Sequence, residues 1–219
     1  MALNENNNKR QYTKYKRHQN DSHERINAET VNSLQKDVNK TQYENTEIKD
    51  KAFEERVYTI FENDKFTNAM FLDYFKTGEY INETDSNNII VTDETRQLTN
   101  KNSKKNARFV SKTIYSAYKD DKAELNDFFL ITSEQLPVGS SIKYYLELEN
   151  GERWNIKPNE IKLPLHLKKD ITCGFSIVAD LISNGIDEAP VINGYAILYW
   201  DSKVEEAYGL TNPDLMRFP

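Results

Sequence analysis

The positions of glycine and proline constrain the fold of this chain more than any other feature of its sequence. The first glycine is Gly78 and the first proline is Pro137, and all six prolines and six of the seven glycines lie in residues 137–219. Long segments without these residues favour helices, whereas turn-forming residues at short intervals favour β-strands. The sequence therefore predicts an α+β fold, with an N-terminal extended arm and long helix followed by an antiparallel β-sandwich.

Composition limits how much of the chain can form a compact core. Hydrophobic residues make up 37% of the 219 residues, a low share that predicts that part of the chain is elongated or bound to a partner. The formal net charge of -6 gives no sign of nucleic-acid binding. No apolar run approaches the roughly 20 residues of a membrane span, and the amino end has no apolar stretch for a signal peptide. We therefore expect a protein that is made in a cytoplasm and has no membrane insertion.

Residues 1–25 form a basic segment with almost no aliphatic side chains. They carry six Lys or Arg residues and three acidic residues. A segment of this composition cannot bury enough apolar surface to fold alone. It is either an arm that docks onto an acidic neighbour or a solvated tail. If it docks, the residues expected to make the contacts are Lys9, Arg10, Lys14, Lys16 and Arg17.

Residues 26–83 are predicted to be a helical assembly segment. Between Ala28 and Glu62 no helix-breaking residue occurs, and seven positions follow an alternating spacing of three and four residues. This spacing is typical of a heptad seam, formed here by Val31, Leu34, Val38, Thr41, Asn45, Ile48 and Ala52. We expect helix association through Val31, Leu34, Val38, Asn45 and Ile48.

Asn45 and two charged residues bear on how this helix would associate. An Asn at an a position of a heptad trades stability for a fixed register. Glu44 and Lys49 sit at a g position and the following e position, where they could pair between parallel chains. The alternative is a single amphipathic helix that packs on its own β domain.

Residues 57–75 are dense in aromatic side chains. We expect them to include a further helical piece that ends near Gly78, with a break at Asn63 and Asp64. Aromatic rings at helical spacing are typical of packing rather than of a cofactor site.

Short strands separated by turn-rich pieces are predicted for the rest of the chain. The candidates are Asn88–Thr92, Arg108–Tyr118, Asp127–Thr132, Ser141–Glu149, Glu152–Lys157, Ile171–Leu181 and Gly194–Trp200. This number and spacing of strands is typical of an antiparallel sandwich. We place the β-sandwich at residues 84–205 and a C-terminal tail at residues 206–219.

The stretch YYLELENGERWNI, residues 144–156, predicts a β-hairpin whose register can be derived. A two-residue loop would scatter the apolar residues over both faces, whereas a three-residue loop with Gly151 in the left-handed conformation places Leu146 opposite Trp154. Tyr144 then lies opposite Ile156, and the apolar residues share one face. We therefore expect the longer loop, with Trp154 pointing into the sandwich.

The carboxyl-terminal half also carries a series of short motifs in a defined order. They are a strand that opens with serine, a Pro-x-Gly turn before a tyrosine pair, a hairpin that ends in tryptophan, and a Pro-Val pair before a closing strand. The matching residues are Ser111, Pro137, Gly139, Tyr144, Tyr145, Gly151, Trp154, Leu181, Pro190, Val191, Tyr195, Ala196 and Tyr199. Residues 84–201 thereby resemble a β-sandwich module found in tail, baseplate and tail-fibre proteins of bacteriophages.

This resemblance implies a structural component of a phage virion tail or baseplate. The arm and helix would join neighbouring subunits, and the β-sandwich would serve as wedge or connector. The expected partners are other virion tail or baseplate proteins, with multiple copies of the chain in each particle. The expected location is the virion, after synthesis in the cytoplasm of the host bacterium.

Enzymatic activity is not expected from this sequence. The three histidines are too few and too scattered for a triad or a metal site, and Cys173 stands alone. There is no phosphate-binding glycine loop and no dinucleotide motif. We therefore predict no catalytic residue, no metal and no cofactor.

Two alternatives to the virion role stay open. One is a glycan-binding receptor module for a host cell wall, because sugar sites on sandwiches use exposed aromatic rings with amide and carboxylate partners. Its candidate contacts are Tyr145, Tyr199 and Trp200, and because Tyr199 and Trp200 are neighbours in a strand, one of them should point outward. The other alternative is a soluble adaptor outside any virus.

Overall fold

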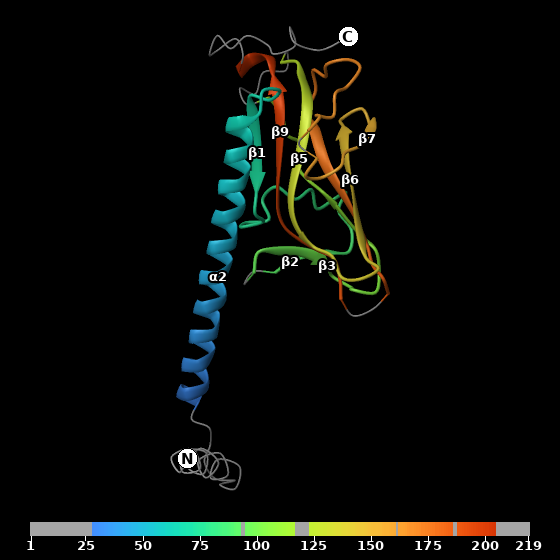
Figure 1. Cartoon of the computed structure of the whole chain (residues 1–219). Coiled ribbons are helices and arrows are strands. Elements are labelled where there is room, and N and C mark those ends of the chain that lie inside the picture. The colour runs from blue at the N-terminus through green and yellow to red at the C-terminus, as the bar shows by residue number, and fades with distance from the viewer. Residues whose placement is uncertain (1–27, 93–94, 117–122, 161, 186–187, 205–219) are drawn as a thin grey trace, which may run out of the picture. The chain divides into compact units, whose positions relative to one another are not determined.

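The computed structural model describes residues 28–92, 95–116, 123–160, 162–185 and 188–204 (Figure 1). The arm expected at residues 1–25 and the tail expected at residues 206–219 lie outside the described residues. The chain divides into two units, Met1–Glu44 and Asn45–Pro219. The helix α2, Ala28–Asn63, begins in the first unit and ends in the second.

The described part of the first unit is the start of α2. Thr41 donates a hydrogen bond to the carbonyl of Asp37 at 2.9 Å, and Lys40 lies 3.8 Å from Glu44. Both side chains of this ion pair are more than half exposed, so the pair contributes at most about 0.5 kcal/mol to the helix.

The second unit contains two antiparallel β-sheets. In the first sheet, β9 (Val191–Asp201) lies at the centre, with β5 (Leu125–Gln135) along one edge. The other edge of β9 pairs with β1 (Ala69–Asp73) and with β3 (Gln97–Asn100), and β3 pairs with β2 (Ile89–Thr92). The second sheet has the order β4 (Ala107–Val110), β8 (Phe175–Ile182), β6 (Ser141–Leu148) and β7 (Arg153–Asn155). The described chain is thus an α+β protein with mostly antiparallel sheets.

The two sheets share an apolar core. Alternate residues of β8, namely Phe175, Ile177, Ala179 and Leu181, face it and are fully buried. The facing residues of β9 are Tyr195, Ile197 and Tyr199. Period-two alternation in both strands therefore builds one continuous core between the sheets, as expected for strands with one buried face.

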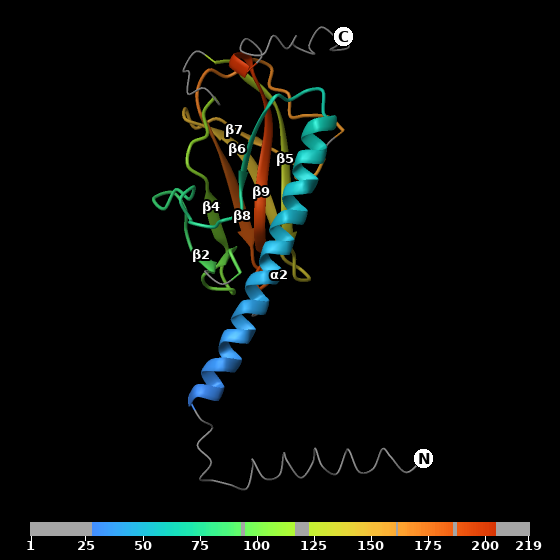
Figure 2. The same cartoon turned by 90° about the vertical axis from the view of Figure 1, so that its left-hand side faces the viewer.

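The end of α2 covers the outer face of the first sheet (Figure 2). Phe53 and Val57 of the helix pack with Ile131 of β5 and with Ala196 and Leu198 of β9. Both faces of β9 are therefore buried, one by the second sheet and the other by the helix. The last turn of α2 is closed by Asn63, whose side chain donates to the Thr59 carbonyl at 2.7 Å.

The predicted hairpin is confirmed. Leu146 pairs with Trp154, the Ile156 amide donates to the Tyr144 carbonyl at 3.1 Å, and Gly151 has a φ of 83°. Tyr144, Leu146 and Ile156 are buried, and Trp154 is partly buried against the core between the sheets. Burial of one face thus decided the register, as the sequence predicts.

The prediction of a further helical piece after residue 63 is wrong. Residues 69–73 instead form β1, which pairs with β9 from Ala69 opposite Tyr199 onward. Phe71 packs against the core between the sheets, whereas Met70 and Leu72 pack against the cluster beneath α2. Because both faces of the strand are apolar, its sequence is a continuous apolar run, which periodicity cannot distinguish from a helix.

One further strand was not predicted, and another is shorter than predicted. Residues 97–100 form β3 although three of the four side chains are polar. The sequence shows no strand pattern here, because only Leu98 of this strand belongs to the apolar core. The strand expected at residues 108–118 ends at Val110. Ile114 beyond it makes only an isolated bridge to Phe175.

Candidate functional site

The inner face of α2 is occupied by the chain's own sheet. Thr46, Phe53 and Val57 are buried, and Ile60 packs against the same cluster. Successive members of this set are three, four or seven residues apart, which places them on one side of a helix. This face is therefore not available to another chain.

Two polar contacts fasten the same helix at its sides. The Asp50 carboxylate lies 3.0 Å from the Arg96 guanidinium, and both side chains are mostly buried. Burial raises the pKa of the Asp50 carboxyl, and the neighbouring Arg96 opposes that rise. Arg56 donates to the Asn159 side-chain oxygen at 2.8 Å, and that oxygen also accepts the Thr132 amide at 3.2 Å.

The predicted heptad seam lies on a different side of α2. At about 100° per residue, the seam positions fall roughly 110° around the helix from the inner face. In the second unit Asn45, Ile48 and Ala52 are exposed, with Ile48 65% exposed. In the first unit Val38 is 51% exposed and Thr41 is exposed as well. The helix does pack on the chain's own first sheet, but through residues other than the seam.

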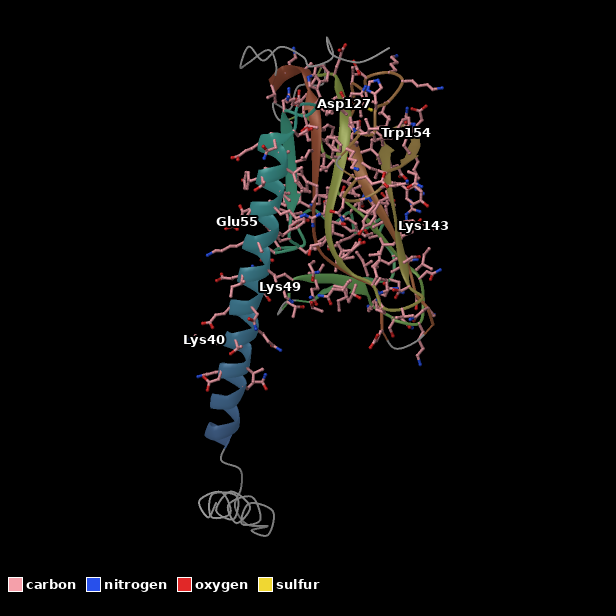
Figure 3. All side chains as sticks on the ribbon, in the orientation of Figure 1. Lys40, Lys49, Glu55, Asp127, Lys143 and Trp154 are labelled. Carbon is pink, nitrogen blue, oxygen red and sulfur yellow. The ribbon has the colours of Figure 1, made fainter. Side chains whose placement is uncertain are left out.

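Several residues predicted to make contacts have side chains outside the described part of the chain. Val31 and Leu34 belong to α2, but their side chains lie outside the described part of the chain. The basic residues Lys9, Arg10, Lys14, Lys16 and Arg17 all fall in residues 1–27, which also lie outside it. Lys49 and Glu55 are exposed, and Glu55 projects from α2 away from the sheets (Figure 3).

The three aromatic residues predicted for a glycan contact are not brought together. Tyr199 and Trp200 are 3% and 5% exposed, so the expectation that one of them points outward into solvent is wrong. Tyr199 packs in the core between the two sheets, and the side of β9 that carries Trp200 is also covered, so neither ring reaches solvent. Tyr145 lies instead on the outer face of the second sheet, half-buried, with the Arg153 guanidinium 5.1 Å from its ring centroid.

A hydrogen-bonded pair that the sequence did not single out lies at a bulge of β5. Asp127 is buried, has a φ of 53°, and lies 2.9 Å from Nδ1 of His166. The preceding Asn126 accepts the Leu167 amide at 2.8 Å and donates to Asp170 at 2.5 Å. These contacts hold residues 165–170 against β5. Their only signal in the sequence is a pair of short polar residues at the start of an apolar strand.

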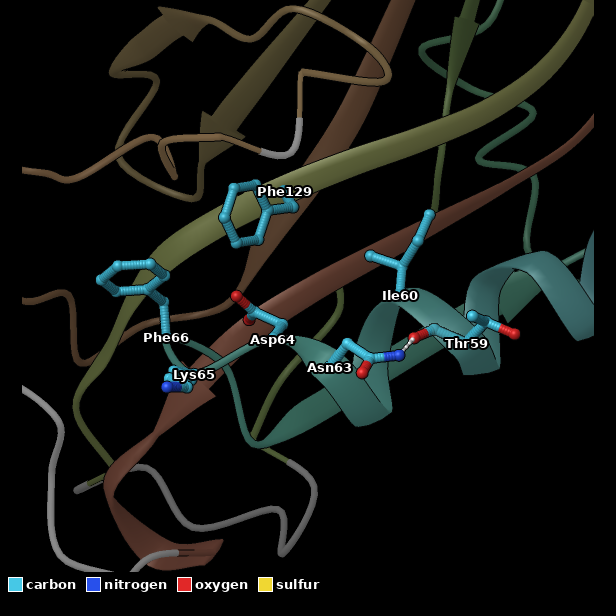
Figure 4. A pocket seen from close by; sticks show the side chains of 7 residues that line it. All are labelled: Thr59, Ile60, Asn63, Asp64, Lys65, Phe66 and Phe129. Carbon is cyan, nitrogen blue, oxygen red and sulfur yellow. Dashed lines mark hydrogen bonds between the residues drawn. The ribbon is translucent and has the colours of Figure 1, made fainter.

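A hollow of about 430 Å³ opens beside the carboxyl end of α2 (Figure 4). Ile60, Phe66 and Phe129 form its apolar part, and Asp64 and Lys65 stand at its polar part. The Thr67 hydroxyl donates to the Asp64 carboxylate at 2.5 Å and so holds this turn. The hollow is a place where an apolar side chain could insert, beside the helix but away from the seam.

A comparison of the sequence with models of protein families, and another with curated proteins, gave no match. Across the described ranges, no helix combines the length and the apolar character needed to cross a membrane.

Proposed function

We propose that this chain is a structural component of a phage virion tail or baseplate. An N-terminal extended arm and long helix join neighbouring subunits, and the β-sandwich serves as wedge or connector between them. Copies of the chain associate through the seam of α2, and the arm docks onto an acidic neighbour. The phage assignment rests on the sequence resemblance of residues 84–201, and the assembly role rests on the seam.

One observation supports the assembly role most directly. The described apolar members of the seam, Val38, Ile48 and Ala52, remain exposed although the helix packs on its own sheet through another face. Exposed apolar residues at heptad spacing are typical of a surface that another helix covers. Asn45 is exposed in the middle of this line, where a polar residue sets the register of paired helices.

The charges next to the seam favour parallel copies. Glu44 and Lys49 are both exposed, and the ion pair of Glu44 with Lys40 is too weak to occupy it. In a parallel pair of helices, Glu44 of one copy would face Lys49 of the other. The occupant of the seam is therefore a second copy of this chain in the same direction.

The association is tested with Ile48→Asp. A charge placed in the seam is expected to weaken self-association by at least about tenfold, because that charge would lose water on association. The measurement is sedimentation equilibrium of the full chain. Tyr58→Asp is the matched control, since Tyr58 is 45% exposed on the opposite flank of α2 and should leave association unchanged. Equal association of Ile48→Asp and the wild type would contradict the role of the seam.

The virion role is tested separately. Particles of the phage whose genome encodes this sequence are purified, and their proteins are identified by mass spectrometry. The chain should be present in intact particles and in isolated tails. A chain deleted of residues 1–25 should fold but no longer incorporate. Absence of the wild-type chain from particles would refute the virion role, and normal incorporation of the deleted chain would refute docking by the arm.

A further inference from the structure

The outer face of the second sheet carries an ordered set of charges. In the strand register, Asp180 of β8 lies between Arg108 of β4 and Lys143 of β6. Arg108 lies 3.7 Å from Asp180 and 3.5 Å from Glu147, which is two rows further along the sheet. The guanidinium of Arg108 therefore spans the row between them, where Val178 is fully buried.

A second arginine holds the ring of Tyr145. Arg153 forms an ion pair with Glu147, and its guanidinium lies over the Tyr145 ring. Because Glu147 also pairs with Arg108, the two arginines are linked through one carboxylate. These contacts hold the Tyr145 ring in place on the side of Glu147. The ring would therefore lose less conformational entropy when a ligand binds.

A hollow of about 350 Å³ lies on the other side of Tyr145. Its lining includes Tyr145, Lys143 and Asp180 from the sheet, and Asn87 and Asn106 from the loops beside β4. Arg153 and Glu147 are not part of the lining, so the hollow meets the part of Tyr145 that they leave uncovered. This volume falls in the range of small-molecule sites.

The polar groups of this hollow form a mixed set of donors and acceptors. The Asn106 side-chain oxygen accepts the Ser183 amide at 3.0 Å, so its Nδ2 is the group that can donate to a ligand. Asp180 supplies carboxylate acceptors, and Lys143 supplies an ammonium donor and projects from the outer face of β6 (Figure 3). Hydroxyl groups on a ring satisfy such a set, because each hydroxyl both donates and accepts a hydrogen bond.

We propose that this hollow is a carbohydrate site that binds one pyranose unit of a glycan. The sugar ring lies against Tyr145, its hydroxyls bond to Asp180 and the two asparagine side chains, and Lys143 donates to a ring substituent. The site is independent of the proposed assembly function, because it lies on β6, β8 and the loops beside β4 rather than on α2. The glycan site predicted from the sequence combined Tyr145 with Tyr199 and Trp200, whereas this site combines Tyr145 with polar residues of the neighbouring strands and loops.

The test uses saturation-transfer difference NMR on the full chain. The probes are glucose, galactose, N-acetylglucosamine, N-acetylgalactosamine and rhamnose, each as the free methyl glycoside. At least one should receive saturation, with a dissociation constant of about 1 mM, since a single sugar offers little apolar area. Tyr145→Ala and Lys143→Ala should each weaken that binding by about fivefold or more, and Asn87→Ala by about threefold, because a ligand hydrogen bond contributes about 1 kcal/mol.

Asn155→Ala is the matched control. Asn155 pairs with Tyr145 across β6 and β7 and is exposed on the same face, but it does not line the hollow. It should change the binding less than twofold. Lys143 and Asn87 are exposed, so their variants should fold even if Tyr145→Ala does not. The proposal is overturned if no probe receives saturation, or if Asn155→Ala weakens binding as much as Lys143→Ala and Asn87→Ala.

Discussion

Asp50 of α2 and Arg96 of the turn between β2 and β3 form an ion pair of 3.0 Å that joins the helix to the first sheet. The two side chains are only 14% and 15% exposed, and Arg96 holds a φ of 49°. An ion pair of this kind differs from a surface pair, because removal of one partner leaves the other charge with little water around it.

Arg96→Ala should therefore lower the free energy of unfolding by about 2 kcal/mol. Urea denaturation followed by circular dichroism measures the change. The control is Lys40→Ala, which removes an ion pair of α2 that is exposed to solvent and should cost no more than about 0.5 kcal/mol. Equal costs for the two variants would mean that the Asp50–Arg96 pair does not hold the helix in solution.

The two lines of apolar residues on α2 should respond differently to truncation. Phe53→Ala removes a ring from the buried cluster beneath the helix and should lower the free energy of unfolding by about 3–4 kcal/mol. Ile48→Ala removes an exposed side chain and should change the stability of the dissociated chain by less than about 0.5 kcal/mol. Denaturation at a concentration below that of self-association compares the two. A large decrease in the free energy of unfolding for Ile48→Ala in the dissociated chain would mean that Ile48 packs against the chain's own sheet, which would contradict an exposed seam.

The pH dependence of stability should depend in part on Asp73. This residue is buried at the end of β1, and one of its carboxylate oxygens accepts the Phe75 amide at 2.8 Å. Burial raises the pKa of the Asp73 carboxyl above its ordinary value of 3.8, although the backbone hydrogen bonds oppose the rise. Between 3.8 and the raised pKa the folded chain binds more protons than the unfolded chain. The contribution of Asp73 to stability is therefore greatest at low pH and falls as the pH rises through this window.

Asp73→Asn should remove that part of the slope. The variant should gain stability relative to the wild type as the pH rises from below 3.8 through the raised pKa of Asp73, because it carries no buried charge at the higher pH. Urea denaturation at a series of pH values measures the difference. The slope should decrease rather than vanish, since burial raises the pKa of Asp50 in the same direction. An unchanged difference between variant and wild type across the series would contradict the raised pKa of Asp73.

The parts of this fold that could be predicted are those in which one face of an element is apolar and the other polar. The hairpin of β6 and β7 is such a case, because a wrong register would have turned Leu146 and Trp154 to opposite faces. By contrast, the spacing of three and four residues on α2 indicated the seam and not the buried face with Phe53 and Val57, and association through the seam stays a prediction.

The elements that were missed are those whose environment is set by distant parts of the chain. β1 is apolar on both faces because α2 covers one of them. No local sequence pattern indicates that a helix covers this face. Trp200 is buried as well, although the alternation of β9 alone would place it in solvent. The hollow beside Tyr145 needs Arg108 and Asp180 at neighbouring positions, which depends on the order β4, β8, β6 in the sheet.

Replacement of two glycines that lie next to strands of the second sheet should lower the free energy of unfolding for two different reasons. Gly151 has a φ of +83° and open space around the position of a Cβ, so Gly151→Ala should cost about 1 kcal/mol from backbone strain alone. Gly151→Asn should cost less, because Asn adopts the left-handed conformation more readily. At Gly174 a Cβ would overlap the Thr113 side chain and the Tyr115 ring, so Gly174→Ala should cost about 1–3 kcal/mol from overpacking. Urea denaturation measures all three variants, and equal stability of Gly151→Ala and the wild type would contradict the left-handed hairpin tip.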